Sequence, residues 1–507
     1  MALDEKLHHG QGGTDTPPLS ESSDYTVTFD GPTDPAHPYR WSRFTKLPTR
    51  FTYHTYSIRL FISITVCVGT LIVSYTSAVF APALESAIKD LGVGAEVGRL
   101  GTTLYVLGFA FGPVFWAPAS ELWGRKWPLT VAMLAGGAFT IGTAVAQNIQ
   151  TLLVCRFFGG VCGASQLTVV PGVLSDLYDN RGRGVAITLY ALCVFCGPFG
   201  APSLGGFTVI NPHLGWRWTL YVPAILSFAN GALTLFFVRE TYAPCILVAK
   251  AKALRRQNKG NSGIHAPHEL VEFDLRRLME KYFTRPLRML ATEPILLLVS
   301  LYMSFVYGLT YCLLAGFPYV FETVHGMRRG VAGLPFLALA VGQVLGVGFV
   351  LSQQREYARK LEANGNVPVP EWRLAPTLVG APVFAGGIFW FGWTGFTAEI
   401  HWAVPTVAGL FLGFGILCVF LPCFNYIVDA YLPLAASAVA ANIILRSSIA
   451  AGFPLFSTQM FRGLGAQWAC TVLGGLAALM IPIPIAFRVY GPRLRAKSTM
   501  LMETNSS

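Results

Sequence analysis

The stretch CGPFGAPSLGG, residues 196–206, lies in the middle of a long apolar run and carries four glycines and two prolines. In water such residues would interrupt a helix, because an interior glycine costs about 1 kcal/mol and an interior proline about 3 kcal/mol relative to alanine. In a bilayer, neighbouring helices can satisfy the backbone groups that proline frees, and glycines let helices approach closely. The stretch therefore predicts a bent membrane-spanning helix that packs against other helices.

The composition of the whole chain also favours a membrane setting. Of its 507 residues, 53% are hydrophobic and 12% are charged, about half the charged share of a soluble domain. The apolar residues form long blocks that match the ~20 residues needed to cross a ~30 Å hydrocarbon core. We expect an all-α membrane protein and not an enzyme. The net charge of +11 comes from lysines and arginines in the loops, which favours topology control over nucleic-acid binding.

The apolar blocks predict twelve spans in two six-helix halves. The first six lie near 60–82, 99–118, 128–147, 151–174, 185–206 and 218–238, and the second six near 294–318, 330–352, 374–393, 402–427, 436–458 and 467–488. The expected domains are a disordered tail (1–57), a first half (58–238), a linker (239–293), a second half (294–489) and a tail (490–507). Twelve spans put the basic loops on one side, predicted to be cytosolic along with both termini. Arg328 and Arg329 fall on the opposite side.

The loop after the second predicted span reads GPVFWAPASELWGRKWPL, residues 112–129. It resembles the signature G-x-L-(S/A)-(D/E)-x-x-G-R-(R/K) of the major facilitator superfamily, with alanine in place of the first glycine. The resemblance implies the twelve-helix fold of that superfamily and a conformational latch that holds an outward-open state. It implies that the acidic residue docks on the eleventh helix and that the arginine pairs with a carboxylate at the end of the fourth. The predicted latch residues are Glu121, Gly124, Arg125, Lys126 and Asp176. A charge cluster that only sets topology is the alternative.

Two further motifs resemble those of drug:proton antiporters. The fourth span carries CRFFGGVCGAS, in which Arg156 is a candidate for proton or substrate coupling, although it could instead snorkel to the membrane interface. The opening stretch resembles the antiporter motif through Gly197, Pro198, Gly205 and Gly206. Together with DGPTDPAHPYRWS (30–42), these motifs resemble the fungal twelve-span drug:proton antiporter (DHA1) family over residues 30–498. The resemblance implies export by exchange.

Polar residues within the predicted spans are the candidates for substrate binding. They are Arg446, Asn442, Tyr307, Tyr311, Gln166, Tyr190, Gln343 and Asn425. Aromatic packing alone would also account for the tyrosines, and Arg446 could be structural. Because the span interiors lack acidic residues while Arg156 and Arg446 lie inside, an organic anion or a secondary metabolite is the favoured cargo. A multidrug or polyamine efflux pump is the alternative, and a non-transporting membrane sensor a remote one.

The predicted mechanism is secondary active export of a small organic metabolite or drug by alternating access. Protons are the expected counter-ion, although facilitated export or anion exchange stays open because no carboxylate is predicted at membrane depth. We expect no cofactor and no metal, since Cys193 and Cys196 form a single CxxC that reads best as apolar filler within a span. We expect a monomer in the lipid bilayer of the plasma membrane.

Overall fold

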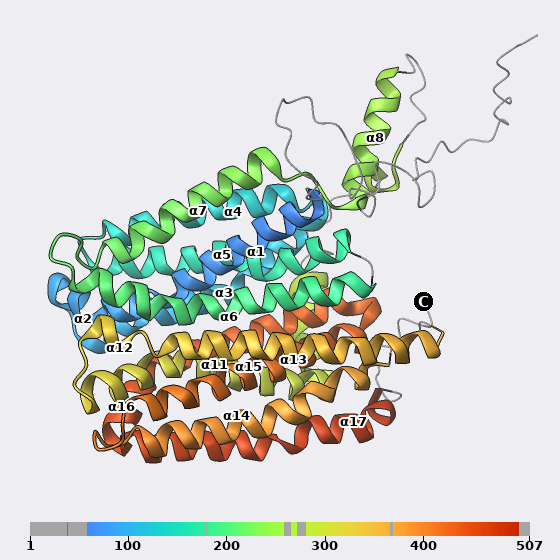
Figure 1. The fold of residues 1–507 in the computed structure, drawn as a ribbon. Coiled ribbons are helices and arrows are strands. Elements are labelled where there is room, and N and C mark those ends of the chain that lie inside the picture. The colour runs from blue at the N-terminus through green and yellow to red at the C-terminus, as the bar shows by residue number, and fades with distance from the viewer. Residues whose placement is uncertain are drawn as a thin grey trace, which may run out of the picture.

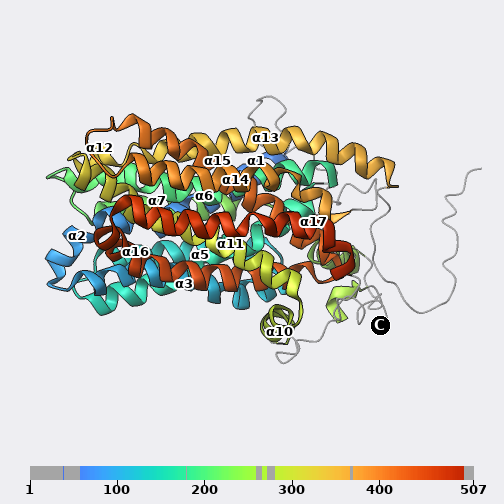
Figure 2. The ribbon, with the colours of Figure 1, turned by 90° about the horizontal axis from the view of Figure 1, so that it is seen from below.

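The computed structural model describes residues 58–178, 180–257, 265–270, 280–365 and 369–495, together with Pro38. The predicted N-terminal tail (1–57), with the motif at 30–42, lies outside these residues apart from Pro38. Residues 258–264 and 271–279 of the predicted linker and residues 496–507 of the predicted tail at 490–507 also lie outside them. The described chain is helical, and its long helices run along one common axis (Figures 1 and 2).

The first group of helices forms one side of the bundle (Figure 1). Its members are α1 (Ile58–Ala78), α2 (Phe80–Leu91), α3 (Ala95–Leu122), α4 (Lys126–Ala144), α5 (Ile149–Leu177), α6 (Asn180–Ile210) and α7 (Trp218–Phe237). The helix α8 (Ala243–Gln257) follows and projects away from the bundle in Figure 1. Short segments, η2 (Pro267–Leu270), η3 (Glu280–Thr284) and α10 (Arg285–Thr292), lead to the second group.

The second group forms the other side of the bundle. Its members are α11 (Pro294–Pro318), η4 (Tyr319–Val324), α12 (Arg329–Ala332), α13 (Phe336–Ala363), η5 (Pro370–Leu374), α14 (Ala375–Thr394), α15 (Ala403–Ala430), η6 (Leu432–Leu434), α16 (Ala435–Met480) and α17 (Pro482–Arg495). One end of the bundle carries α2 and α12, and we call it the Glu85 end. The opposite end carries α8 and α17, and we call it the Arg125 end (Figure 1).

Eleven helical stretches among the described residues are long and apolar enough to cross a membrane. The last of these, Ala435–Arg495, contains Gly465 with φ 75° and ψ 168°, where the chain breaks between two helices. Its two parts account for the last two of the twelve predicted spans. The all-helical membrane fold predicted from the apolar blocks is therefore confirmed, and the chain is a multi-pass membrane protein. The exact domain boundaries stay predictions.

Glycine allows a close backbone contact between two helices in each group. A Cβ added to Gly160 on α5 would lie 2.0 Å from the carbonyl oxygen of Tyr105 on α3. A Cβ added to Gly413 on α15 would likewise lie 2.0 Å from the carbonyl oxygen of Leu339 on α13. Only a residue without a side chain allows backbones to meet this closely. The second and fourth long helices of each group are thus held together in the same way.

Candidate functional site

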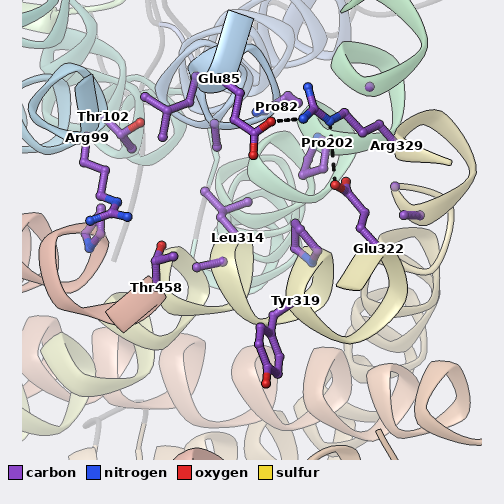
Figure 3. A pocket seen from close by; sticks show the side chains of 18 of the residues that line it. Pro82, Glu85, Arg99, Thr102, Pro202, Leu314, Tyr319, Glu322, Arg329 and Thr458 are labelled. Atoms are coloured by element: carbon purple, nitrogen blue, oxygen red, sulfur yellow. Dashed lines mark hydrogen bonds and ion pairs between the residues drawn. The ribbon is translucent and has the colours of Figure 1, made fainter. Parts of the chain in front are cut away.

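A cavity of about 410 Å³ lies between the two helix groups at the Glu85 end (Figure 3). Four of its lining residues are prolines, one each from α2, α6, α11 and α16: Pro82, Pro202, Pro318 and Pro454. Both groups therefore build its walls. A cavity of this size, placed between two groups of helices, is suited to a small organic molecule.

Polar contacts join the two helix groups around the mouth of this cavity. Glu85 on α2 forms an ion pair with Arg329 on α12, and Arg329 Nε lies 3.8 Å from Glu322 Oε2 (Figure 3). Glu96 Oε1 accepts from the cavity-lining Arg99 and, at 2.5 Å, from Gln459 Nε2 of the other helix group. Arg329, one of the two exceptions to the predicted charge distribution, thus has two carboxylate partners.

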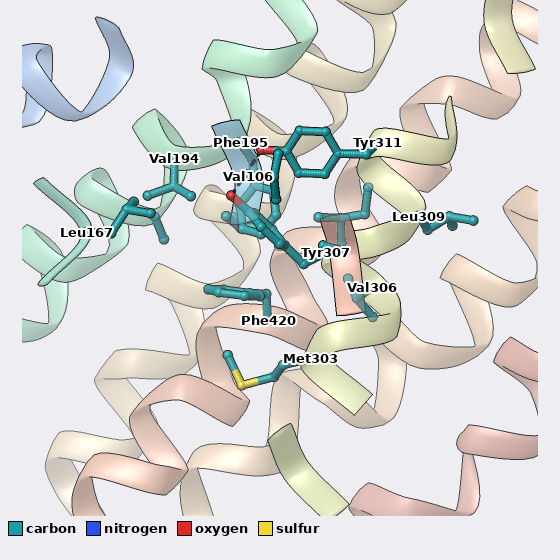
Figure 4. Close-up of a cluster of buried hydrophobic side chains, with 14 of the residues drawn as sticks. Val106, Leu167, Val194, Phe195, Met303, Val306, Tyr307, Leu309, Tyr311 and Phe420 are labelled. Carbon is teal, nitrogen blue, oxygen red and sulfur yellow. Dashed lines mark hydrogen bonds between the residues drawn. The ribbon is translucent and has the colours of Figure 1, made fainter. Parts of the chain in front are cut away.

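Tyr311 lines the cavity and forms what we call its floor. A cluster of buried side chains that includes Tyr307, Phe195 and Phe420 lies next to Tyr311 (Figure 4). The Tyr311 hydroxyl lies 3.0 Å from Ser77 Oγ, which belongs to the other helix group, and 3.2 Å from the Tyr307 hydroxyl. Phe195 of α6 packs against Tyr307 and against Phe420 of α15, with ring centroids 5.9 and 4.7 Å apart. The two groups therefore meet at this depth through aromatic rings and one hydroxyl pair.

Arg446 lies within the aromatic cluster and is only 3% exposed. Its guanidinium carbon is 4.6 Å from the centroid of the Tyr307 ring and 4.9 Å from that of Phe420. Its Nε has no hydrogen-bond partner in the described structure. Arg446 is not among the residues that line the cavity, and the contacts of its guanidinium that the structure shows are with these two ring faces.

Arg156 is 1% exposed and does not snorkel to the membrane interface. Its Nε donates to the carbonyl oxygen of Gly101 at 2.8 Å, and its two terminal nitrogens donate to Thr76 and Ser77 at 2.9 and 3.1 Å. Its guanidinium carbon also lies 4.3 Å from the centroid of the Tyr105 ring. A planar fork of donors matches three carbonyls in this way. Arg156 thus ties α1, α3 and α5 together.

The remaining binding candidates are dispersed. Asn442 donates to Ser300 Oγ at 3.1 Å, Tyr190 donates to the carbonyl of Leu167, and Gln343 accepts from Cys196. Gln166 is buried between helices of the first group, and its side-chain oxygen has no partner in the described structure. Asn425 lines a separate, small pocket with Tyr357 and Arg373, within the second helix group. Of the eight candidates, Tyr307, Tyr311 and Arg446 are brought together at the floor.

The antiporter-like motif on α6 faces both helix groups. A Cβ on Gly197 would lie 2.6 Å from Ser74 Cβ on α1, and one on Gly205 would lie 2.7 Å from Pro82. A Cβ on Gly206 would instead lie 3.0 Å from the carbonyl oxygen of Arg329 in the second group. Gly200 has no neighbour within 4 Å of such a Cβ, so the expectation of close packing is wrong for this glycine. Pro198 lies inside the continuous helix α6.

The predicted latch residues gather at the Arg125 end. Arg125 Nε lies 3.1 Å from Asp176 Oδ2, as the motif predicts. The carboxylate of Glu240 accepts from the backbone nitrogens of Arg125 at 2.7 Å and of Lys126 at 3.1 Å. Gly124 has φ +83° and sits directly against this carboxylate. Glu240 is not among the predicted latch residues, although its carboxylate holds the turn at Gly124.

Glu121 departs from the expected docking on the eleventh helix. Its Oε2 pairs with Lys281 Nζ of η3 at 2.6 Å, and the carbonyl of Lys281 accepts from Ser437 at the start of α16. Lys281 therefore stands between Glu121 and α16. Burial raises the pKa of the neighbouring Tyr282, and the nearby Glu121 carboxylate adds to the effect. No group of three or more His, Cys, Asp or Glu side chains in the described ranges could hold a metal ion.

Known proteins resemble this chain along most of its length. The family model described as Major Facilitator Superfamily matches residues 66–454. The major facilitator superfamily multidrug transporter FLU1 of Candida albicans is 42% identical over 489 residues, which are 96% of this chain and 78% of that protein. The multidrug transporter TPO1_2 of Candida glabrata is 44% identical over 489 residues, 96% of this chain and 82% of that protein. The fold is similar to that of the E. coli proton:xylose symporter XylE, with a TM-score of 0.59 at 17% identity over 84% of this chain and 95% of that one.

Proposed function

This chain belongs to the major facilitator superfamily, and from that premise we propose that it is a multidrug exporter. In this proposal it moves small, uncharged, partly aromatic organic molecules out of the cell in exchange for protons, by alternating access. The family consists of membrane transporters of small molecules and not of enzymes. The proposal adds the direction of transport, the kind of cargo and the counter-ion.

The observation that carries the choice of cargo is that neither buried arginine, Arg156 or Arg446, lines the cavity. The Nε and the two terminal nitrogens of Arg156 each donate a hydrogen bond to a backbone carbonyl oxygen. Arg446 faces two aromatic rings and does not line the cavity. Neither guanidinium is therefore placed to contact a cargo in this cavity, and the arginines Arg99 and Arg329 that do line it are paired with Glu96 and Glu85. The similarity to two proteins named multidrug transporters supports the same choice over the organic anion that the sequence favoured.

A polyamine is disfavoured on similar grounds. Recognition of a polycation needs carboxylates that are available to the cargo. The carboxylates Glu85 and Glu322 that line the cavity stand at its mouth, and both lie beside Arg329. Tyr311 at the floor and Phe336 elsewhere in the lining offer rings and a hydroxyl.

The orientation in the membrane follows from the distribution of basic residues. The Arg125 end carries most basic loops, which favours the cytosolic side for this end. The cavity at the Glu85 end then opens toward the exterior, as in the release state of an exporter. Both termini are placed in the cytosol, and the plasma membrane is the proposed location.

A transport panel tests the proposal. The purified chain is reconstituted in liposomes, and uptake of radiolabelled cycloheximide, fluconazole, itaconate and spermidine is compared with that of protein-free liposomes. We expect protein-dependent uptake of one or both neutral drugs and none of itaconate or spermidine. Uptake restricted to itaconate would restore the organic-anion hypothesis, and uptake restricted to spermidine would establish polyamine transport.

A further inference from the structure

The hydroxyl groups at the cavity floor form a chain whose direction can be worked out. Ser77 Oγ donates to the carbonyl oxygen of Ser74 at 2.7 Å, and this bond uses its only proton. The contact between Ser77 and Tyr311 at 3.0 Å therefore has Tyr311 as the donor. Since Tyr311 has then spent its own proton, the contact at 3.2 Å with Tyr307 has Tyr307 as the donor.

The position of Tyr311 makes this direction important. Of the three residues in this row of hydroxyl groups, Ser77, Tyr307 and Tyr311, only Tyr311 lines the cavity. Its oxygen already accepts from Tyr307, while its proton goes to Ser77 on the other helix group. A molecule at the floor can thus receive the Tyr311 proton only by replacing Ser77. A molecule that offers a proton instead competes with Tyr307.

We propose that Tyr311 is the specificity-determining residue of the cavity, and that it selects cargo carrying a carbonyl or ether oxygen next to an aromatic or apolar body. This proposal rests on the proposed function and deepens it. The cargo oxygen replaces Ser77 as the acceptor of the hydrogen bond from the Tyr311 hydroxyl. The cargo body packs against lining residues such as Leu314 and Phe336. No covalent bond changes.

The exchange also links cargo binding to the contact between the two helix groups. The Ser77–Tyr311 bond joins α1 to α11 at the level of the floor. When cargo replaces Ser77, this bond is lost and a bond between cargo and α11 takes its place. Binding of an acceptor-bearing cargo therefore loosens the two groups at this depth, whereas a hydrocarbon of the same shape leaves the bond intact.

The competition between Ser77 and cargo predicts opposite effects for two small substitutions. Tyr311→Phe removes the donor and should weaken binding of an acceptor-bearing ligand by about 2- to 10-fold, the range for one neutral hydrogen bond. Ser77→Ala removes the competitor, leaves the Tyr311 proton free and should strengthen binding by a factor in the same range.

Equilibrium dialysis with the purified full-length chain measures these effects. The probes are benzophenone, which has one carbonyl, and diphenylmethane, which has the same two rings and no acceptor. We expect benzophenone to bind more weakly to Tyr311→Phe and more tightly to Ser77→Ala, with little change for diphenylmethane. Size-exclusion elution and thermal melting of each variant confirm that it is folded.

The outcomes separate this inference from the proposed function. If both substitutions weaken benzophenone binding, or neither changes it, the Tyr311 assignment is overturned even when the wild-type chain transports the drugs of the panel. If the wild-type chain transports no drug of the panel, the proposed function fails. The two benzophenone shifts still decide the Tyr311 assignment in that case, because opposite signs support it and equal signs contradict it.

Discussion

Substitution of Gly124 should destabilise the protein in two ways that can be measured separately: strain in the backbone and displacement of the Glu240 carboxylate. Gly124 has φ +83°, and a Cβ added there would lie 2.2 Å from Glu240 Oε2. Gly124→Ala therefore both strains the backbone and forces the carboxylate away from the turn. Gly92 has φ +63° and no neighbour within 4 Å of an added Cβ. Gly92→Ala is thus a matched control that carries the backbone cost alone.

The magnitudes follow from these contacts. A left-handed backbone costs a residue with a Cβ about 1–2 kcal/mol, and this is the whole expected effect of Gly92→Ala. Gly124→Ala also disturbs the two hydrogen bonds from Arg125 and Lys126 backbone nitrogens to Glu240. Hydrogen bonds to a charged group contribute about 1.5–3 kcal/mol each. Losing one of them brings the expected destabilisation to about 2.5–5 kcal/mol.

Thermal melting of both variants in detergent micelles, followed by tryptophan fluorescence, measures the difference. We expect the melting temperature of Gly124→Ala to fall further than that of Gly92→Ala, because only Gly124→Ala also disturbs the hydrogen bonds to Glu240. Glu240→Gln should show part of the same loss, because it keeps the acceptor but removes the charge. Equal melting temperatures for the two glycine variants would refute the role given to the Glu240 carboxylate.

Three further outcomes follow from the described contacts. Arg156→Lys should melt well below wild type, because one ammonium replaces three directed bonds worth about 1 kcal/mol or more each; an unchanged melting temperature would contradict the structural role. Arg446→Ala should lose about 1–2 kcal/mol of stability while benzophenone affinity stays within twofold, and a tenfold affinity loss measured by dialysis would make Arg446 a ligand. The hydrogen bond from Arg217 lowers the pKa of Asp90 on α2. The ion pair between Asp90 and Arg217 is therefore lost only when the pH falls through that lowered pKa. Asp90→Asn should consequently keep the wild-type pH profile of transport between pH 5 and 8.

The sequence predicted those features that depend on residues close together or on a family motif. Long apolar blocks with few charges located the spans, because hydrocarbon excludes unpaired backbone groups wherever the span lies. The Arg125–Asp176 ion pair followed from motif residues at the ends of two predicted spans, and the distance of 3.1 Å agrees.

The features that the sequence did not reveal depend on contacts between the helix groups. Ser77 looks like any small residue in an apolar run, and only its contact with Tyr311 gives it a role. Arg329 appeared as an exception to the charge distribution, although Glu85 balances it from a helix about 240 positions away. Asn425 shares the apolar setting of the other candidates, yet it faces a pocket inside its own group. The rotation of each helix about its own axis determines which neighbours these side chains contact, and the sequence does not show that rotation.

The central claim is that the chain exchanges an outgoing drug for protons, and lumenal pH tests it most directly. Liposomes containing the protein and a pH-sensitive dye are loaded with the neutral drug that the panel identifies, and are then diluted into drug-free buffer of equal pH. The account predicts that drug leaving the lumen drives protons inward, so that the lumen acidifies only when the protein is present. Drug efflux without a pH change, or with alkalinisation of the lumen, would contradict it.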